Sequence, residues 1–140
     1  MSGAILSALF FTVALLVTTA YFIMGSIPLL VLKHDTPLDA RFVRGFFNIY
    51  YVAACISAAA ASVSYAVAGR MGVAFGAAGL AGIALLLRRM VIPKMDALGA
   101  QIGTDYMEAI PGFRKLHVTA ILINVVQLAA IVWSLLVSSR

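Results

Sequence analysis

The chain is poor in charge: only 11% of its 140 residues are charged, whereas soluble domains carry about a quarter. Hydrophobic residues make up 64%, and the charges crowd into two short windows between long apolar segments. This composition excludes a soluble domain and predicts a polytopic membrane protein. The net charge of +5 would suggest nucleic acid in a soluble chain, but membrane topology and anionic lipid headgroups explain it here.

Cysteine and the usual catalytic patterns are also scarce. Cys55 is the single cysteine, so the chain has no disulfide framework and no cysteine-based metal site. It lacks a glycine-rich phosphate loop and a plausible Ser–His–Asp set. No Asp, Glu, Lys or Arg lies well inside an apolar segment, although pumps and ion-coupled transporters usually need such a group. These absences argue against an enzyme and weaken the case for a transporter.

Four apolar segments are long enough to cross a bilayer, which predicts an all-α, four-helix membrane bundle in a single domain, 1–140. The segments cover about residues 4–32, 46–68, 71–92 and 116–137. Pro28 predicts a bend near the end of the first segment. The third should end before Pro93, and part of 94–102 should then form a short interfacial helix.

Basic residues are divided unequally between the two sides of this predicted bundle. Two of them, Arg70 and Arg140, lie on the side of the termini, and eight lie in the connections after the first and third segments. These eight are Lys33, Arg41, Arg44, Arg88, Arg89, Lys94, Arg114 and Lys115. The asymmetry places those connections in the cytoplasm and both termini on the non-cytoplasmic side.

This topology predicts a multi-pass protein of a plasma membrane, and the family resemblance given below implies a bacterial inner membrane. Basic side chains close to a cytoplasmic membrane surface attract anionic lipids. The residues expected at headgroup level are Arg88, Arg89, Arg114 and Lys115.

The third segment carries glycines at helical spacing. Gly72 and Gly76 are four residues apart, the spacing that allows close helix approach in lipid, and Gly79 continues the face. We interpret this face as the closest helix contact within the chain. The alternative is a dimerisation face, in a homo-oligomer or with other membrane subunits.

Polar residues of the fourth segment share one helix face. His117 and Asn124 are seven residues apart, which nearly closes two turns. An Asn in hydrocarbon needs a hydrogen-bond partner, so this face should point into the bundle. We interpret it as an interhelical hydrogen-bonded layer, with a ligand site as the alternative. The candidate ligand-binding residues are His117, Asn124, Asn48, Tyr51 and Ser26.

The two histidines raise the question of a metal or haem. His34 and His117 lie on the same predicted side of the membrane, and imidazole ligates haem iron. We expect instead that His34 is a solvated loop residue and that His117 is hydrogen bonded between helices. No cofactor is therefore expected, with haem b as the lesser alternative.

Three stretches carry a family resemblance: FNIYY (47–51), IPKMDALGAQ (92–101) and FRKLHVTAILIN (113–124). Their order resembles an uncharacterised four-helix bacterial membrane family related to the eukaryotic transmembrane proteins associated with cisplatin resistance. The glycine–proline end of the first segment and the early Asn of the second resemble anthrone-oxygenase-like membrane proteins. The last span of those proteins tends to begin with Asn and, three residues later, Arg, where this chain has His117 and Ala120. Neither resemblance implies a catalytic residue.

Two functions follow as hypotheses. The first is a non-catalytic helical module, either an accessory subunit of a membrane complex or a binder of a small lipophilic solute. The alternative is a membrane oxidoreductase that uses haem, quinone or no cofactor, as the anthrone-oxygenase resemblance implies.

Overall fold

The computed structural model describes residues 1–104 and 108–138, so Arg140, counted above, lies outside the described residues. Within these ranges the chain forms four helices: α1 (Gly3–Leu29), α2 (Pro37–Val67), α3 (Met71–Gln101) and α4 (Ala109–Ser138). Each helix is long and apolar enough to cross a membrane. The prediction of an all-helical, four-helix chain is confirmed, and its helices are those of a multi-pass membrane protein.

Local signals in the sequence set several helix ends. Ser2 caps α1, and Thr36 caps α2 by accepting a hydrogen bond from the Asp39 amide at 3.2 Å. Pro37 occupies the first turn of α2, where its missing N–H has no helical partner to lose. Gly69 has a φ of +76° and makes the tight turn between α2 and α3.

The helices differ from the predicted spans mainly at the end away from the termini. Helix α1 ends at Leu29, so Pro28 lies in its last turn. Helices α2 and α4 begin earlier than predicted, at Pro37 and Ala109. The separate interfacial helix is wrong, because α3 continues through Pro93. Pro93 and Lys94 are exposed, while Ile92 before them and Met95 after them pack into the core, and this packing holds the helix together.

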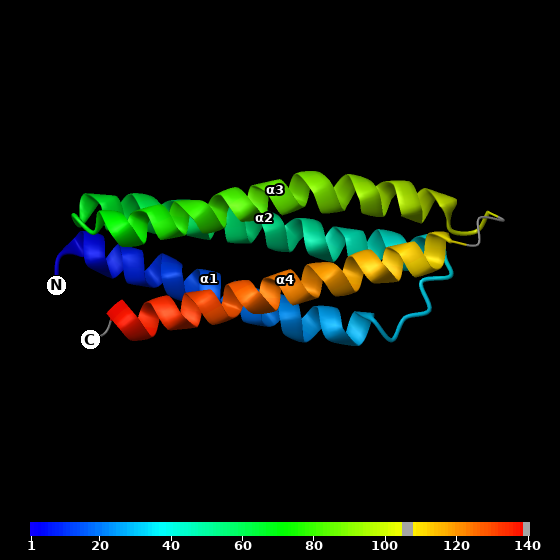
Figure 1. Ribbon diagram of the computed structural model, residues 1–140, viewed down its shortest axis with the longest axis horizontal. Coiled ribbons are helices and arrows are strands. Elements are labelled where there is room, and N and C mark those ends of the chain that lie inside the picture. The colour runs from blue at the N-terminus through cyan, green and yellow to red at the C-terminus, as the bar shows by residue number, and fades with distance from the viewer. Residues whose placement is uncertain (105–107, 139–140) are drawn as a thin grey trace.

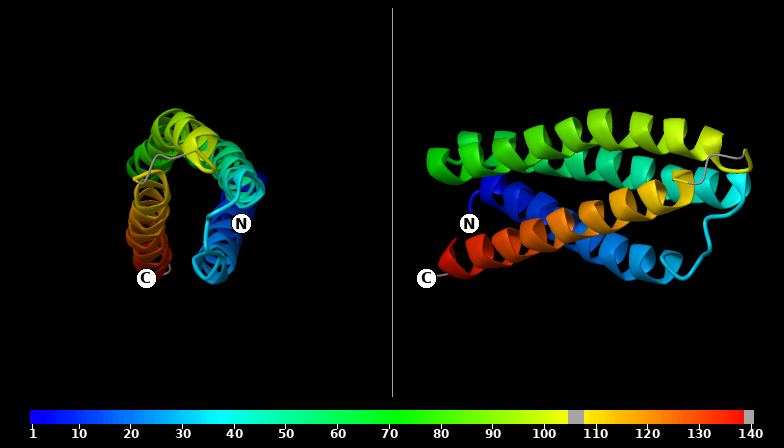
Figure 2. Two further views of the ribbon diagram at one scale, coloured as in Figure 1. Left: turned by 90° about the vertical axis from the view of Figure 1, so that its right-hand side faces the viewer. Right: turned by 45° about the vertical axis from the view of Figure 1, so that its right-hand side comes forward.

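The four helices follow one another around an arch when the bundle is viewed end-on (Figure 2). Helix α2 packs most extensively, against α3 and α1, while α4 crosses α1 and makes smaller contacts with α1 and α3. The two ends of the described chain lie at the same end of the bundle, together with the α2–α3 turn (Figure 1). The α1–α2 connection lies at the opposite end.

Aromatic rings fill the core between α1 and α2. Phe22 stacks on Tyr50, with ring centroids 4.0 Å apart, and meets Phe47 edge to face at 4.8 Å. Further along α2, Ala54 and Ala58 are buried, and their small side chains allow neighbouring helices to approach closely. This packing fixes the rotation of α2 and therefore the direction of its polar side chains.

Candidate functional site: a buried polar layer and an apolar groove

A buried polar layer joins α1, α2 and α4 midway along the bundle. The Tyr50 hydroxyl donates to Asn124 Oδ1 at 2.6 Å, and Asn124 Nδ2 donates to the Ala120 carbonyl at 2.7 Å. Thr19 Oγ1 lies 3.5 Å from the Tyr50 oxygen and donates to the Leu15 carbonyl. Asn124 is fully buried, so the prediction that it points into the bundle is confirmed.

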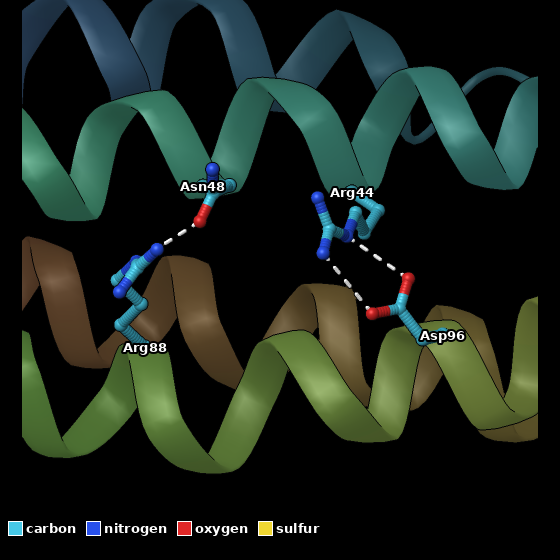
Figure 3. Close-up of polar contacts among 4 residues, drawn as sticks. All are labelled: Arg44, Asn48, Arg88 and Asp96. Atoms are coloured by element: carbon cyan, nitrogen blue, oxygen red, sulfur yellow. Dashed lines mark hydrogen bonds and ion pairs between the residues drawn. The ribbon is translucent and has the colours of Figure 1, made fainter.

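Of the two residues of the second helix predicted to lie near Asn124, Tyr51 does and Asn48 does not. Tyr51 is fully buried, and its hydroxyl lies close to Asn124 without forming a well-aligned hydrogen bond. Asn48 does not join the layer, because it turns toward α3 and accepts a hydrogen bond from Arg88 Nε at 3.0 Å (Figure 3). Tyr50 was missed. The sequence did contain a signal, since Tyr50 continues the apolar periodicity of Phe47 while Asn48 lies off that face.

A second polar contact joins α2 to α3 nearer the connections. Arg44 forms a two-pronged ion pair with Asp96, with nitrogen–oxygen distances of 2.9 and 3.1 Å (Figure 3). Both side chains are partly exposed, at 35% and 55%. Together with the Arg88–Asn48 bond, this pair sets the register of α2 against α3.

His117 is fully buried on the inner face of α4, as predicted. Its Nε2 lies 3.1 Å from the backbone carbonyl of Ser26. A carbonyl only accepts, so Nε2 carries the proton of the neutral ring and Nδ1 keeps its lone pair. Nδ1 is buried without a partner. Ser26 thus contributes its backbone to this contact, while its hydroxyl donates to the Ile23 carbonyl at 3.3 Å.

The prediction that His34 is a solvated loop residue is wrong. His34 is fully buried and has a φ of +57°, a left-handed conformation uncommon outside glycine. Its ring packs against Phe113 and, edge to face, against His117, with centroids 5.4 and 5.6 Å away. Its ring lies near the Leu32 backbone, but neither ring nitrogen forms a well-aligned hydrogen bond. Burial, and then the nearby Arg114 guanidinium, lower the pKa of His34 below its usual 6.5.

The histidine pair does not fit a haem held between the two rings. A macrocycle ligated by both residues would have to lie between them, whereas the rings are in direct edge-to-face contact. Nε2 of His117 is also engaged by the Ser26 carbonyl. In the described part of the chain, no group of three or more His, Cys, Asp or Glu residues is arranged to hold a metal ion.

The glycines of α3 do not make the close helix contact that was predicted. A methyl group added at Gly72, Gly76 or Gly79 would meet no heavy atom within 4 Å. The buried face of α3 carries Ala74 and Ala77, and the glycines lie on nearly the opposite side of the helix. The expectation of an intramolecular contact is therefore wrong, and the dimerisation face stays a prediction.

Two of these glycines instead line an apolar groove of about 380 Å³ in the half of the bundle nearest the termini. All four helices contribute to its walls, including Leu15 of α1, Ala61 of α2 and Ile131 of α4. The hydroxyl groups that line it bond within the protein. Thr12, for example, donates to the Ala8 carbonyl at 2.7 Å and lies 3.2 Å from the Tyr65 hydroxyl. The groove therefore presents mainly hydrocarbon.

The four basic residues expected at headgroup level are all exposed; they are Arg88, Arg89, Arg114 and Lys115. Two of them also hold the protein together. Arg88 bonds Asn48, and an Arg114 Nη donates to the Leu30 carbonyl at 2.9 Å, which ties α4 to the end of α1.

Comparisons of the chain with protein-family profiles, with curated proteins and with solved structures give no match. The two family resemblances drawn from its short motifs therefore stay predictions.

Proposed function

We propose that this chain is a non-catalytic membrane module that holds a small lipophilic molecule in the groove between its four helices. The observation that carries the proposal is the groove itself: about 380 Å³ of space with largely apolar walls. This volume falls within the range of about 300–1,000 Å³ that small-molecule sites usually have. Its walls belong to helices that are long and apolar enough to span a bilayer, so a ligand that partitions into lipid can reach it.

The ligand class follows from the lining. The hydroxyl groups around the groove already bond within the protein, as Thr12 does with Ala8 and Ser134 Oγ does with the Ile131 carbonyl at 2.8 Å. A strongly polar or charged ligand would be desolvated there without new partners. An apolar chain or ring system would lose no hydrogen bonds on entry, so we assign the groove to lipophilic molecules.

The orientation of the module is part of the proposal. Eight of the ten basic residues lie on the side of the α1–α2 connection, in that connection and in the adjoining parts of α2, α3 and α4. They support a cytoplasmic position for that end, and both termini would then lie outside the cytoplasm. Reporters fused at Arg70 and after the C-terminus should be located, and therefore active, outside the cytoplasm. Activity of either fusion in the cytoplasm would contradict this orientation. A bacterial inner membrane with anionic lipids at the basic end fits the same charge pattern.

Filling the groove tests the proposed function. Gly76→Leu places a side chain into open space at the groove wall, whereas Gly82→Leu adds the same side chain at another exposed glycine of α3 that does not line it. We expect Gly76→Leu to reduce binding of a fluorescent lipophilic probe, and of copurified lipid measured by mass spectrometry, at least severalfold. Gly82→Leu should bind as the parent chain does.

Thermal unfolding separates this outcome from misfolding. Both variants should keep the parent melting temperature within a few degrees, because a Cβ added at either position meets no heavy atom within 4 Å. Equal ligand binding by Gly76→Leu and Gly82→Leu, with both proteins folded, would reject the groove as the binding site.

A further inference from the structure

The contact between the two histidines is the least satisfied polar contact in the described part of the chain. Five buried side-chain polar atoms there lack a hydrogen-bond partner, and three of them are ring nitrogens of His34 and His117. Neither histidine contributes to the groove. Buried polar groups are normally paired, so an unpaired cluster of this size calls for an explanation.

We propose that His34 and His117 form a proton-binding site, and that proton uptake by His34 releases the connection of residues 30–36 from α4. Two neutral imidazoles in contact are the closed form of this site. In the open form His34 leaves its buried position and its ring is hydrated. The proposal is independent of what occupies the groove.

The charges around His34 disfavour a proton in the closed form. Arg114 faces it from α4 and repels an imidazolium, while Asp35 in the connection and Asp39 in α2 attract one. The other titratable group in contact with His34 is His117, whose Nδ1 carries a lone pair and no proton. Burial and Arg114 together outweigh the Leu32 backbone, which favours the protonated ring, and the two aspartates, so the pKa of His34 is lowered.

The direction in which pH changes the opening of the connection follows from this lowered pKa of His34. The open form has the ordinary histidine pKa of about 6.5, and the closed form has a lower one. Above pH 6.5 His34 is neutral in both forms, and the closed form keeps its full stability relative to the open form. As the pH falls below about 6.5, the open form takes up a proton first, and the advantage is progressively lost.

The backbone around His34 is suited to release. The residue is held at φ +57°, and the connection is tied to α4 through the Arg114 bond to the Leu30 carbonyl. Its neighbours Lys33 and Asp35 are exposed. His117 lies about 32 Å along α4 from Ser138, which is roughly the thickness of a hydrocarbon core, so protons can arrive from the headgroup region.

The effect of pH on the ratio of open to closed forms can be calculated for a single titrating group. If the closed form stays neutral, the open-to-closed ratio grows in proportion to 1 + 10^(pKa − pH), with the open-form pKa of about 6.5. Between pH 7.5 and pH 5.5 this ratio rises about tenfold. A proton taken up by His117 in the open form would add to this value.

Hydrogen–deuterium exchange of the full chain in lipid nanodiscs tests the proposal. After correction for the chemical pH dependence of amide exchange, protection of residues 30–36 should fall from pH 7.5 to pH 5.5, by up to about tenfold. The His34→Gln variant should show no such fall. The α2–α3 turn, residues 68–70, should not respond to pH in either protein. An equal fall in both proteins, or protection that increases at low pH in the parent chain, would overturn the proposal.

A second measurement needs no substitution. The chain has only two histidines, so selective ¹⁵N-histidine labelling gives two assignable imidazole signals. The loss of protection in 30–36 should follow the protonation of His34. A His34 ring that stays neutral at pH 5.5 while the connection opens would refute the coupling, even if His34→Gln failed to fold.

Discussion

Removal of the Tyr50 hydroxyl tests whether the buried polar layer holds α2 against α4. Tyr50→Phe keeps the ring that stacks on Phe22 at 4.0 Å and deletes only the donor to Asn124 Oδ1, 2.6 Å away. Stranding a buried acceptor costs about 1–3 kcal/mol in soluble proteins. Interhelical hydrogen bonds measured in a membrane bundle are weaker, averaging about 0.6 and reaching about 1.7 kcal/mol. Because Asn124 is fully buried, we expect a loss in the upper part of that lower range.

A double-mutant cycle with Asn124→Leu isolates the pair. The double variant removes both partners, so it should lose less stability than the sum of the single variants, with a coupling energy of about 0.6–1.7 kcal/mol. Reversible unfolding in mixed micelles, followed by circular dichroism, measures each free energy. Tyr21→Phe, at a position 72% exposed on α1, is the matched control and should change nothing. A coupling energy of zero would refute the reasoning.

The remaining predictions on stability concern residues of α3. Gly82→Ala should raise the unfolding free energy by up to about 1 kcal/mol, because Gly82 lies in a helix interior with open space around it. Gly99→Ala should forfeit this gain, because its new methyl would lie 3.2 Å from the Ala40 Cβ, and thermal melts of the two variants compare them directly. Asp96→Asn should lower stability by less than about 1 kcal/mol, since its pair with Arg44 is partly exposed. High salt should abolish that difference, and a loss that persists in salt would show that the pair acts by other means.

The burial of His117 and Asn124 could be predicted because it depends on one helix alone. A polar side chain in an apolar helix has to face protein, and the spacing of seven residues brings the two to the same face. Their partners could not be predicted in the same way. Whether Asn48 or Tyr50 meets Asn124 depends on the rotation of α2, which the aromatic packing around Phe22 sets.

The errors over His34 and the glycines have a common cause. The local sequence around His34 is polar, and nothing in it shows that α4 brings Phe113 and His117 over the connection. Small residues likewise mark a helix face that can pack closely without showing which face does so. Alanines of α3 pack against the rest of the bundle, and Gly72 and Gly76 line the groove instead.

The order of the groove, the buried polar layer and the histidine contact along the bundle decides how a ligand would reach the groove. Along α4 the groove begins at Ala130, the polar layer lies at Asn124, and the histidine contact lies at His117. Helix α1 repeats this order, from Leu15 at the groove to Ser26 at the histidine contact. The Tyr50–Asn124 bond therefore lies between the groove and the basic end of the bundle.

This order makes entry from the bilayer the shorter route. A lipophilic molecule coming from the basic end would have to cross a hydrogen-bonded layer that lies within the buried core, whereas the groove is bordered by spans that face lipid. Lateral entry predicts that Tyr50→Phe, which loosens the layer, leaves the rate of probe uptake from vesicles unchanged. The bulky Gly76→Leu should slow or prevent that uptake. Faster uptake in Tyr50→Phe would instead place the entrance at the basic end, beside the histidine pair.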